Sequence, residues 1–400
     1  MKILVYRWDI YPYDNIIDTL TRQGHQTDVL AFSVKSHIED EDFSRVLEDK
    51  IKESGCELVF SVNFYAVIAK TCFRNNVRYA AWTCDTPLLS MLHPSVFHPT
   101  NYIFTFDKMQ YEHFKKQGLD HIYYLPLAGA PATPLTENAR SLPQAPRDKK
   151  YYYDVTFIGS LYEKNRYDEI YDILPDNLCG YLDAIIEAGK RISGGNFISR
   201  MLTDEILSQI SQYVSVEGNV LSDSALKIHV ETAVLSYKIA AEIRTDALWL
   251  LSQSYNTHLF TSTPRSDAAM TELSALNNLH CHPPVDYQTK LPDIFRRSKI
   301  NLNFTIPNIQ NGIPLRVFDI LSSGGFLLTD CRDALYELFE DGKDLVVFDG
   351  MSDMIEKAGH YLTHPSEREQ IARSGMEKVH RLHTYDHRIR EILRIIKTAP

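Results

Sequence analysis

The chain of 400 residues has few cysteines, and they do not cluster. Its six cysteines are scattered, without the close pair that a structural zinc site uses. No apolar run approaches the roughly 20 residues of a membrane span, and charged residues at positions 7 and 9 interrupt the N-terminal apolar stretch before a signal peptide is complete. The sequence therefore predicts a soluble, cytoplasmic protein with reduced thiols and no integral membrane segment.

The chain also lacks positive charge and the common nucleotide-binding motifs. It has 42 basic and 52 acidic side chains, for a formal net charge of −10, so its surface as a whole repels a phosphate backbone. Neither GxGxxG nor GxxxxGK[ST] occurs. A general nucleic-acid partner is not expected. A local basic pocket for a diphosphate is compatible with this net charge, because the net charge of the chain does not determine the charge of a single pocket.

The hydrophobic pattern predicts an α/β protein. Hydrophobic residues make up 44% of the chain, and the length suits two domains. Short apolar segments alternate with helical patterns, which predicts parallel strands joined by right-handed crossovers. The expected strands are 3–6, 29–32, 58–62, 79–82, 102–106, 122–125, 154–158, 257–261, 300–304, 325–329 and 344–348. We expect two Rossmann-like, doubly wound parallel-sheet domains that face a cleft.

A proline-rich stretch marks the expected domain boundary. We predict an N-terminal domain over 1–130, a linker over 131–150 and a C-terminal domain over 151–380. The second domain carries a mostly helical insertion at about 166–250. A final helix, 381–400, is expected to pack back on the N-terminal domain. The sequence does not indicate the oligomeric state.

The loops that follow strands are the expected ligand-binding segments, because ligands of open parallel sheets bind at the carboxyl ends of the strands. In the first such loop, Gly159 permits close backbone approach, while Lys164 and Arg166 can neutralise phosphate charge. The alternative is an ordinary turn with solvated charges. A second segment opens with Asn311 and Gly312 and continues as a helix.

That helix carries Arg316 and Asp319. An arginine can form a bidentate pair with a diphosphate, and a carboxylate one turn later can accept hydrogen bonds from ribose hydroxyls. The plainer interpretation is an Arg–Asp pair on a surface helix at positions i and i+3. Both interpretations stay open at this point.

Three segments resemble the C-terminal domain of GT-B glycosyltransferases, and most of all the CgeB-like spore-maturation group. They are Ser298–Phe304, Pro314–Thr329 and the tail from Glu367 to Tyr385. Tyr79–Pro87 and Tyr124–Ala128 resemble the partner domain of that group. The resemblance covers most of the chain and is loose between about 166 and 250.

The resemblance implies a metal-independent transferase whose donor is a nucleoside-diphosphate sugar of the UDP or GDP type. The donor would bind the C-terminal domain, with Gly159 and Arg316 near the diphosphate. Many GT-B enzymes carry two glutamates eight positions apart; here Asn311 stands at the first position and Asp319 at the second. Asp319 would bind ribose, whereas the stereochemical outcome does not carry over. No metal and no further cofactor are expected.

The N-terminal domain would bind the acceptor, which is a glycan, a protein or a small molecule. Asp85 follows a predicted strand and is our candidate general base for the acceptor hydroxyl. The alternative is that Asp85 caps a turn. His93 and His98 could replace it as base, although isolated loop histidines are usually polar surface. Two rival functions stay open: a sugar-nucleotide epimerase, and a non-catalytic nucleotide or sugar sensor of the same fold.

Overall fold

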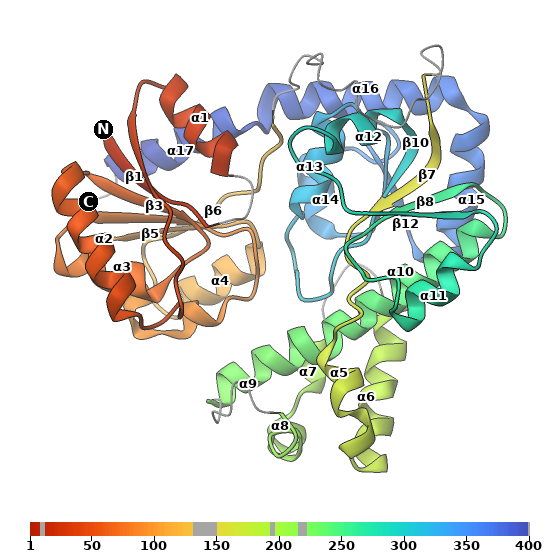
Figure 1. Cartoon of the computed structure of the whole chain (residues 1–400), viewed down its shortest axis with the longest axis horizontal. Coiled ribbons are helices and arrows are strands. Elements are labelled where there is room, and N and C mark those ends of the chain that lie inside the picture. The colour runs from red at the N-terminus through yellow and green to blue at the C-terminus, as the bar shows by residue number, and fades with distance from the viewer. Residues whose placement is uncertain (9–12, 131–149, 193–196, 215–221, 399–400) are drawn as a thin grey trace. The chain divides into compact units, whose positions relative to one another are not determined.

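The computed structural model describes residues 1–8, 13–130, 150–192, 197–214 and 222–398. The chain divides into two compact units: Met1–Ala128 with His383–Pro400 (unit 1), and Gly129–Leu382 (unit 2). Each unit contains a six-stranded parallel sheet flanked by helices (Figure 1). The predicted fold class, two Rossmann-like α/β domains with parallel sheets, is confirmed. The predicted linker lies outside the described residues except for its last residue, Lys150.

Unit 1 is built on a sheet with strand order β2-β1-β3-β4-β5-β6. Its strands are β1 (Lys2–Tyr6), β2 (Gln26–Leu30), β3 (Leu58–Val62), β4 (Arg78–Trp82), β5 (Asn101–Thr105) and β6 (Ile122–Tyr124). The flanking helices are α1 (Tyr13–Arg22), α2 (Glu41–Ser54), α3 (Ala66–Arg74), η1 (Leu89–Leu92), η2 (Pro94–Phe97), α4 (Lys108–Lys116) and α17 (Tyr385–Thr398). Strands β3 and β5 are buried along their whole length, because helices cover both faces of a parallel sheet.

The C-terminal helix α17 belongs to unit 1. Its Arg388 donates hydrogen bonds from Nε to the carbonyls of Pro126 and Leu127, at 2.8 and 3.2 Å. Asp386 forms an ion pair with Arg22 of α1 at 3.0 Å. These contacts tie the last helix to the carboxyl-terminal end of the first sheet and to the first helix.

Unit 2 is built on a sheet with strand order β12-β11-β10-β7-β8-β9. Its strands are β7 (Tyr153–Ile158), β8 (Thr257–Phe260), β9 (Leu279–His282), β10 (Ser298–Asn303), β11 (Leu327–Asp330) and β12 (Val346–Phe348). The helices after β8 are α11 (Ala268–Ser274), α12 (Leu291–Arg297), α13 (Leu315–Ser322), α14 (Asp333–Leu338), α15 (Gly350–Thr363) and α16 (Pro365–Leu382). Strands β7 and β10 are adjacent in the middle of the sheet, with Ile300 paired to Val155.

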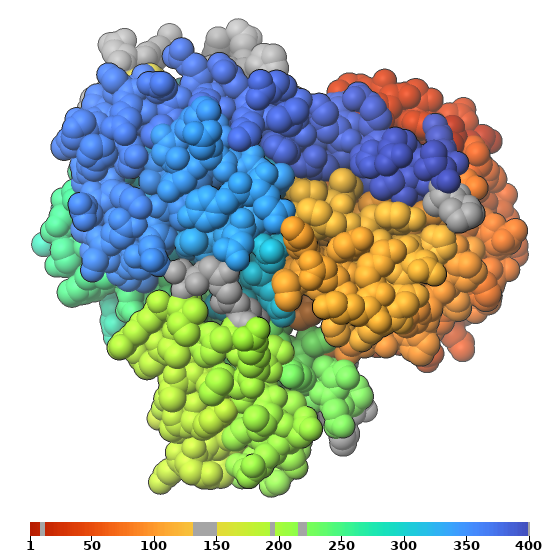
Figure 2. Space-filling model, turned by 180° about the vertical axis from the view of Figure 1, so that it is seen from behind, coloured from red at the N-terminus to blue at the C-terminus, as the bar shows by residue number. Residues whose placement is uncertain are grey.

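A helical insertion separates β7 from β8 and forms its own lobe (Figure 2). It comprises α5 (Arg166–Ile170), η4 (Tyr171–Ile173), α6 (Asp176–Gly189), α7 (Ile198–Met201), α8 (Asp204–Ile210), α9 (Asp223–His229), the π-helical segment η5 (Val230–Ser236) and α10 (Tyr237–Ser252). A separate apolar cluster, which includes Leu182, Ile186 and Leu235, forms its core. Helix α10 also packs against the sheet through Ala247, Leu248 and Leu251. The insertion is therefore anchored to the sheet by its last helix.

The sequence pattern missed one strand and displaced another. Strand β9 has the sequence Leu-His-Cys-His. Because of its two histidines, this short edge strand lacks the apolar run from which a strand is predicted. Strand β2 lies at 26–30 where we predicted 29–32; it too is an edge strand, and most of its residues are exposed. Both errors fall on edge strands, where burial on two faces does not impose a continuous apolar run.

Candidate functional site

The central strands of unit 2 bring two of the predicted loops together. Because β7 and β10 are parallel neighbours, the loop that begins at Gly159 and the loop that begins at Phe304 start at the same edge of the sheet. The backbone N–H of Gly159 donates a hydrogen bond to the carbonyl of Phe260 at 3.0 Å, so this residue is held in the sheet. This edge is where ligands of open parallel sheets bind.

The loop after β7 has an unusual backbone conformation. Tyr162 adopts a φ of 55°, in the left-handed region that tyrosine rarely occupies. Its ring stacks on Tyr237 with a centroid distance of 4.7 Å, and the guanidinium of Arg244 lies 4.6 Å from the same ring. Packing from the insertion therefore holds the loop in a conformation that it would not adopt by itself.

The two predicted cations of this loop differ in their surroundings. Lys164 is exposed, and its charge is available to solvent. Arg166, the first residue of α5, forms an ion pair with Glu169 of the same helix. The sequence prediction that both side chains neutralise a phosphate stays untested, and Arg166 would have to exchange Glu169 for that phosphate.

Helix α13 brings Arg316 and Asp319 together. Nη1 of Arg316 lies 3.7 Å from Oδ2 of Asp319 and has no hydrogen-bond partner among the described residues. The hydroxyl of Tyr287 donates a hydrogen bond to Oδ1 of Asp319. The side chains of Arg316 and Asp319 are 22% and 11% exposed, so both lie in a protected position and not on an open helix face.

Burial dominates the electrostatics of Asp319. It raises the pKa of this carboxyl group to about 6, against the opposing effects of the Arg316 charge and the Tyr287 hydrogen bond. Near neutral pH the carboxylate therefore sits close to its titration point. Of the other predicted residues, Asn311 is half-buried and Gly312 is buried, both just before Pro314 at the start of α13.

Sequence reasoning missed two residues at this edge, Tyr287 and Arg244. Tyr287 follows β9, the strand that the pattern did not predict. Arg244 lies on α10 of the insertion, about 80 residues along the chain from the loop that it contacts. Neither residue belongs to a motif, and only the fold brings them to the site.

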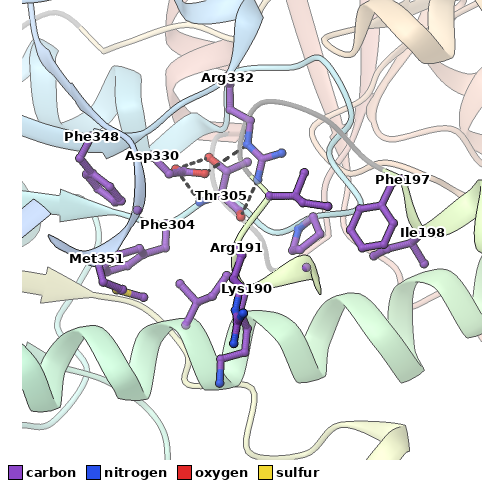
Figure 3. Close-up of a pocket in the computed structure, with 15 residues that line it drawn as sticks. Lys190, Arg191, Phe197, Ile198, Phe304, Thr305, Asp330, Arg332, Phe348 and Met351 are labelled. Carbon is purple, nitrogen blue, oxygen red and sulfur yellow. Dashed lines mark hydrogen bonds and ion pairs between the residues drawn. The ribbon is translucent and has the colours of Figure 1, made fainter. Parts of the chain in front are cut away.

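A pocket opens between the carboxyl ends of β10, β11 and β12 and the insertion (Figure 3). One side carries a polar network: Oδ1 of Asp330 accepts hydrogen bonds from the backbone N–H and hydroxyl of Thr305, each at 2.9 Å. Arg332 donates from Nε to Oδ2 of Asp330 at 3.1 Å. Lys190 and Arg191 of the insertion also line the pocket, and the other lining side chains are mostly apolar, among them Phe197, Phe304 and Phe348. No motif in the sequence indicates this pocket.

In unit 1, Asp85 lies at the carboxyl end of β4 and is exposed. Nδ2 of Asn63, which follows the neighbouring strand β3, donates a hydrogen bond to Oδ2 of Asp85 at 2.7 Å. Oδ1 of Asn63 accepts hydrogen bonds from the backbone N–H groups of Cys84 and Asp85, at 2.9 and 3.2 Å. Asn63 thus fixes both the backbone and the carboxylate of Asp85, and the other oxygen, Oδ1, remains available to a ligand.

The two histidines near Asp85 have structural contacts. Nδ1 of His93 accepts a hydrogen bond from the backbone N–H of Ser95 and caps η2. His98 stacks on Phe73, with ring centroids 4.2 Å apart. These contacts favour the interpretation of both histidines as surface polar groups.

The described residues lack two other kinds of feature. Within the described ranges, no group of three or more His, Cys, Asp or Glu side chains is arranged to hold a metal ion. Among the helices that the structure describes, none is both long and apolar enough to cross a membrane. All six cysteines are free.

Comparison with known proteins gives one family match. Residues 252–394, somewhat more than a third of the chain, match the family model described as "Glycosyl transferase-like". The matched segment includes α13 with Arg316 and Asp319. No curated protein matches.

Solved structures match over the whole length at low sequence identity. Anabaena Alr3699/HepE in complex with UDP and glucose has a TM-score of 0.56 at 10% identity, and each chain is covered completely. Sucrose-phosphate synthase from Thermosynechococcus elongatus also gives 0.56, at 8% identity with complete coverage. A Listeria monocytogenes protein described as a UDP-N-acetylglucosamine 2-epimerase gives 0.51 at 10% identity, covering 99% of this chain and 96% of the other. The chain thus has the GT-B fold of glycosyltransferases, as the sequence predicts.

The buried Asp319 predicts a specific pH dependence of stability. Its folded-state pKa of about 6 lies above the ordinary 3.8, so the folded chain holds a proton that the unfolded chain releases between about pH 4 and pH 6. The stability gained from this proton is complete below about pH 4 and is lost as the pH rises through about 6. Relative to the native chain, Asp319→Asn should therefore gain about 2–3 kcal/mol of unfolding free energy between pH 4 and pH 7.

Urea unfolding of both proteins at several pH values measures this difference. Asp344→Asn is the matched control: despite burial, hydrogen bonds from Lys378 and Ser374 lower the pKa of Asp344. That variant should gain relative stability as the pH falls, which is the opposite direction. A constant difference between native protein and Asp319→Asn across the range would show that Asp319 titrates normally.

Proposed function

We propose that this protein is a glycosyltransferase that moves a sugar from a nucleoside-diphosphate sugar to an acceptor hydroxyl. The observation that carries the proposal is the Arg316–Asp319 pair, 3.7 Å apart and largely buried at the start of α13, within the segment that matches the glycosyl transferase-like model. Arginine and carboxylate suit the two polar parts of such a donor, its diphosphate and its ribose.

In the proposed reaction, unit 2 stabilises the departing nucleoside diphosphate. Arg316 would offset the charge that develops on the diphosphate as the bond to the sugar breaks. The backbone at Gly159 and the charge of Lys164 would contact the phosphates from the loop after β7. Asp319 would accept hydrogen bonds from the ribose hydroxyls in place of the hydrogen bond that Tyr287 donates. Asn311 and Gly312 would lie beside the transferred sugar.

The proposed donor base is uracil, with guanine as the alternative. The similarity to HepE, whose structure contains UDP and glucose, supports this choice. The acceptor is a glycan, a protein or a small molecule. The CgeB-like group remains the proposed family within this fold, and the cytoplasm remains the proposed location. The reaction is proposed to need no metal, because basic side chains supply the charge.

Asp85 is the proposed general base for an acceptor bound to unit 1. A base must reach the acceptor hydroxyl with a free carboxylate oxygen, and Oδ1 of Asp85 fits this requirement since Asn63 binds Oδ2. The position of Asn63 supports the proposal, because the amide fixes the carboxylate without neutralising it.

A thermal-shift screen against nucleoside diphosphates and their sugar conjugates, with and without EDTA, tests the proposal. A ligand at about 100 times its dissociation constant adds roughly 2.7 kcal/mol to the folded state. We expect one nucleotide to raise the melting temperature equally with and without EDTA. We expect Arg316→Ala to lose most of that shift, and Arg297→Ala, which removes an ion pair with Asp293 on α12, to keep it. No shift with any nucleotide would contradict a donor site.

Turnover of Asp85→Asn tests the base. Loss of a positioned general base should lower the transfer rate by roughly 10²-fold while donor affinity stays unchanged. Asp107→Asn is the matched control, since Asp107 follows the next strand, β5, and caps α4. An active Asp85→Asn enzyme would remove Asp85 from catalysis. Donor turnover without any acceptor would favour the epimerase, and binding without turnover would favour the sensor.

A further inference from the structure

Arg244 is a buried cation that the proposed function has not used. It lies on α10, at the end of the insertion, and is 7% exposed. Nη1 donates a hydrogen bond to the carbonyl of Ser160 at 2.6 Å, and Nη2 donates one to the carbonyl of Phe304 at 2.9 Å. One guanidinium therefore joins the first residues of the two loops that begin at the ends of β7 and β10.

The same guanidinium fixes the side chains around it. It lies 4.6 Å from the ring of Tyr162 and 5.3 Å from the ring of Phe157. Tyr162 is the residue with the left-handed backbone. Arg244 thus holds the conformation of the loop after β7 by bonding its backbone and by contacting its strained tyrosine.

The charge of Arg244 has no carboxylate of its own. Its Nη atoms bond to two carbonyls, the side chain of Tyr162 also interacts favourably with it, and Nε is buried without a partner among the described residues. Asp330 is the acidic group that acts on it, and Arg332 already binds Asp330 at 3.1 Å. Arg316 repels it from the start of α13. A buried charge in such surroundings is unfavourable unless an anion approaches.

Positive charge is in excess among the charged groups that act on Arg244 and their ion-pair partners. Arg244, Arg316 and Arg332 face two carboxyl groups, Asp319 and Asp330. The negative charge of a bound diphosphate would balance this excess of positive charge.

We propose that Arg244 is a positioning residue of the donor site: it fixes the loops after β7 and β10 and supplies positive charge for the diphosphate, so that the helical insertion is a working part of that site. This inference rests on the proposed function, because it concerns the same donor. It assigns the insertion a role in recognising the diphosphate and none in recognising the nucleoside.

The test compares two ligands in the full-length chain, a nucleoside diphosphate and its unphosphorylated nucleoside, by calorimetry and by competition. Arg244→Met should lower the affinity for the diphosphate by about tenfold or more and change the affinity for the nucleoside by less than about twofold. Arg244→Lys keeps the charge and loses part of the bonding, so its affinity for the diphosphate should lie between those of the native chain and Arg244→Met.

Arg368→Met is the matched control. Arg368 is equally buried, binds a carbonyl (Tyr361), lies 5.1 Å from the ring of Tyr151 and has an Nε without a partner in the described part of the chain. It lies on α16 and contacts Tyr151, which precedes β7, so it is near the amino end of that strand and not at the carboxyl end where the site lies. The Arg368→Met substitution should lower the melting temperature. It should leave the ratio of the affinity for the diphosphate to the affinity for the nucleoside unchanged.

The outcomes separate this inference from the function on which it rests. If the native chain binds no nucleoside diphosphate, the proposed function fails. If the native chain binds and folded Arg244→Met binds the diphosphate equally well, the role of Arg244 is refuted. Equal losses for diphosphate and nucleoside would also refute it, because they indicate general collapse of the site. If Arg244→Met does not fold, Arg244→Lys provides the test. If the ratio of its affinity for the diphosphate to its affinity for the nucleoside equals that of the native chain, the proposal is overturned.

Discussion

The parallel pairing of β7 with β10 is the constraint on which the candidate site depends. These strands are more than 130 residues apart in the sequence, and their hydrogen-bonded register places Ser298 beside Tyr153 and Leu302 beside Phe157. Because parallel strands end at the same edge, the register brings the loop after Ile158 next to the loop after Asn303. Arg244 then binds both loops, and α13 begins a few residues beyond the second. A shift of this register would separate the loop after β7 from the loop that leads to α13.

The electrostatics at this edge follow from burial. Carboxylates and guanidinium groups that lie at the ends of buried strands lose hydration, so each needs a partner. Asp330 has two such partners, Thr305 and Arg332. Asp319 has a hydrogen bond from Tyr287 and a more distant Arg316. Arg244 has carbonyls and no carboxylate. The incomplete pairing of the two arginines is the physical reason to expect an anion here.

Much of the fold could be predicted from the sequence, because strands buried on two faces produce continuous apolar runs. Leu58–Val62 is such a run, and its predicted bounds match β3. Edge strands lack this signal, which explains the shift at β2 and the loss of β9. For the same reason Tyr287, which follows β9, could not be placed.

The site was less predictable than the fold. Arg316 and Asp319 lie one turn apart on one helix, so their spacing predicts contact directly. Asn63 binds Asp85 through the pairing of β3 with β4, and Arg244 reaches Ser160 from a distant helix. Such contacts depend on the tertiary fold and leave no local pattern. The roles of Gly159, Lys164, Arg166, Asn311 and Gly312 stay predictions.

Hydrogen–deuterium exchange of the full chain, with and without a saturating nucleoside diphosphate, tests whether the donor binds at the carboxyl ends of β7 and β10. A ligand protects the backbone N–H groups that it contacts or makes rigid. We expect slower exchange in peptides that cover 159–166 and 304–320, with little change in peptides of unit 1. Protection confined to unit 1, or to the strands β8 and β9 of unit 2, would contradict the assignment of the donor to the ends of β7 and β10.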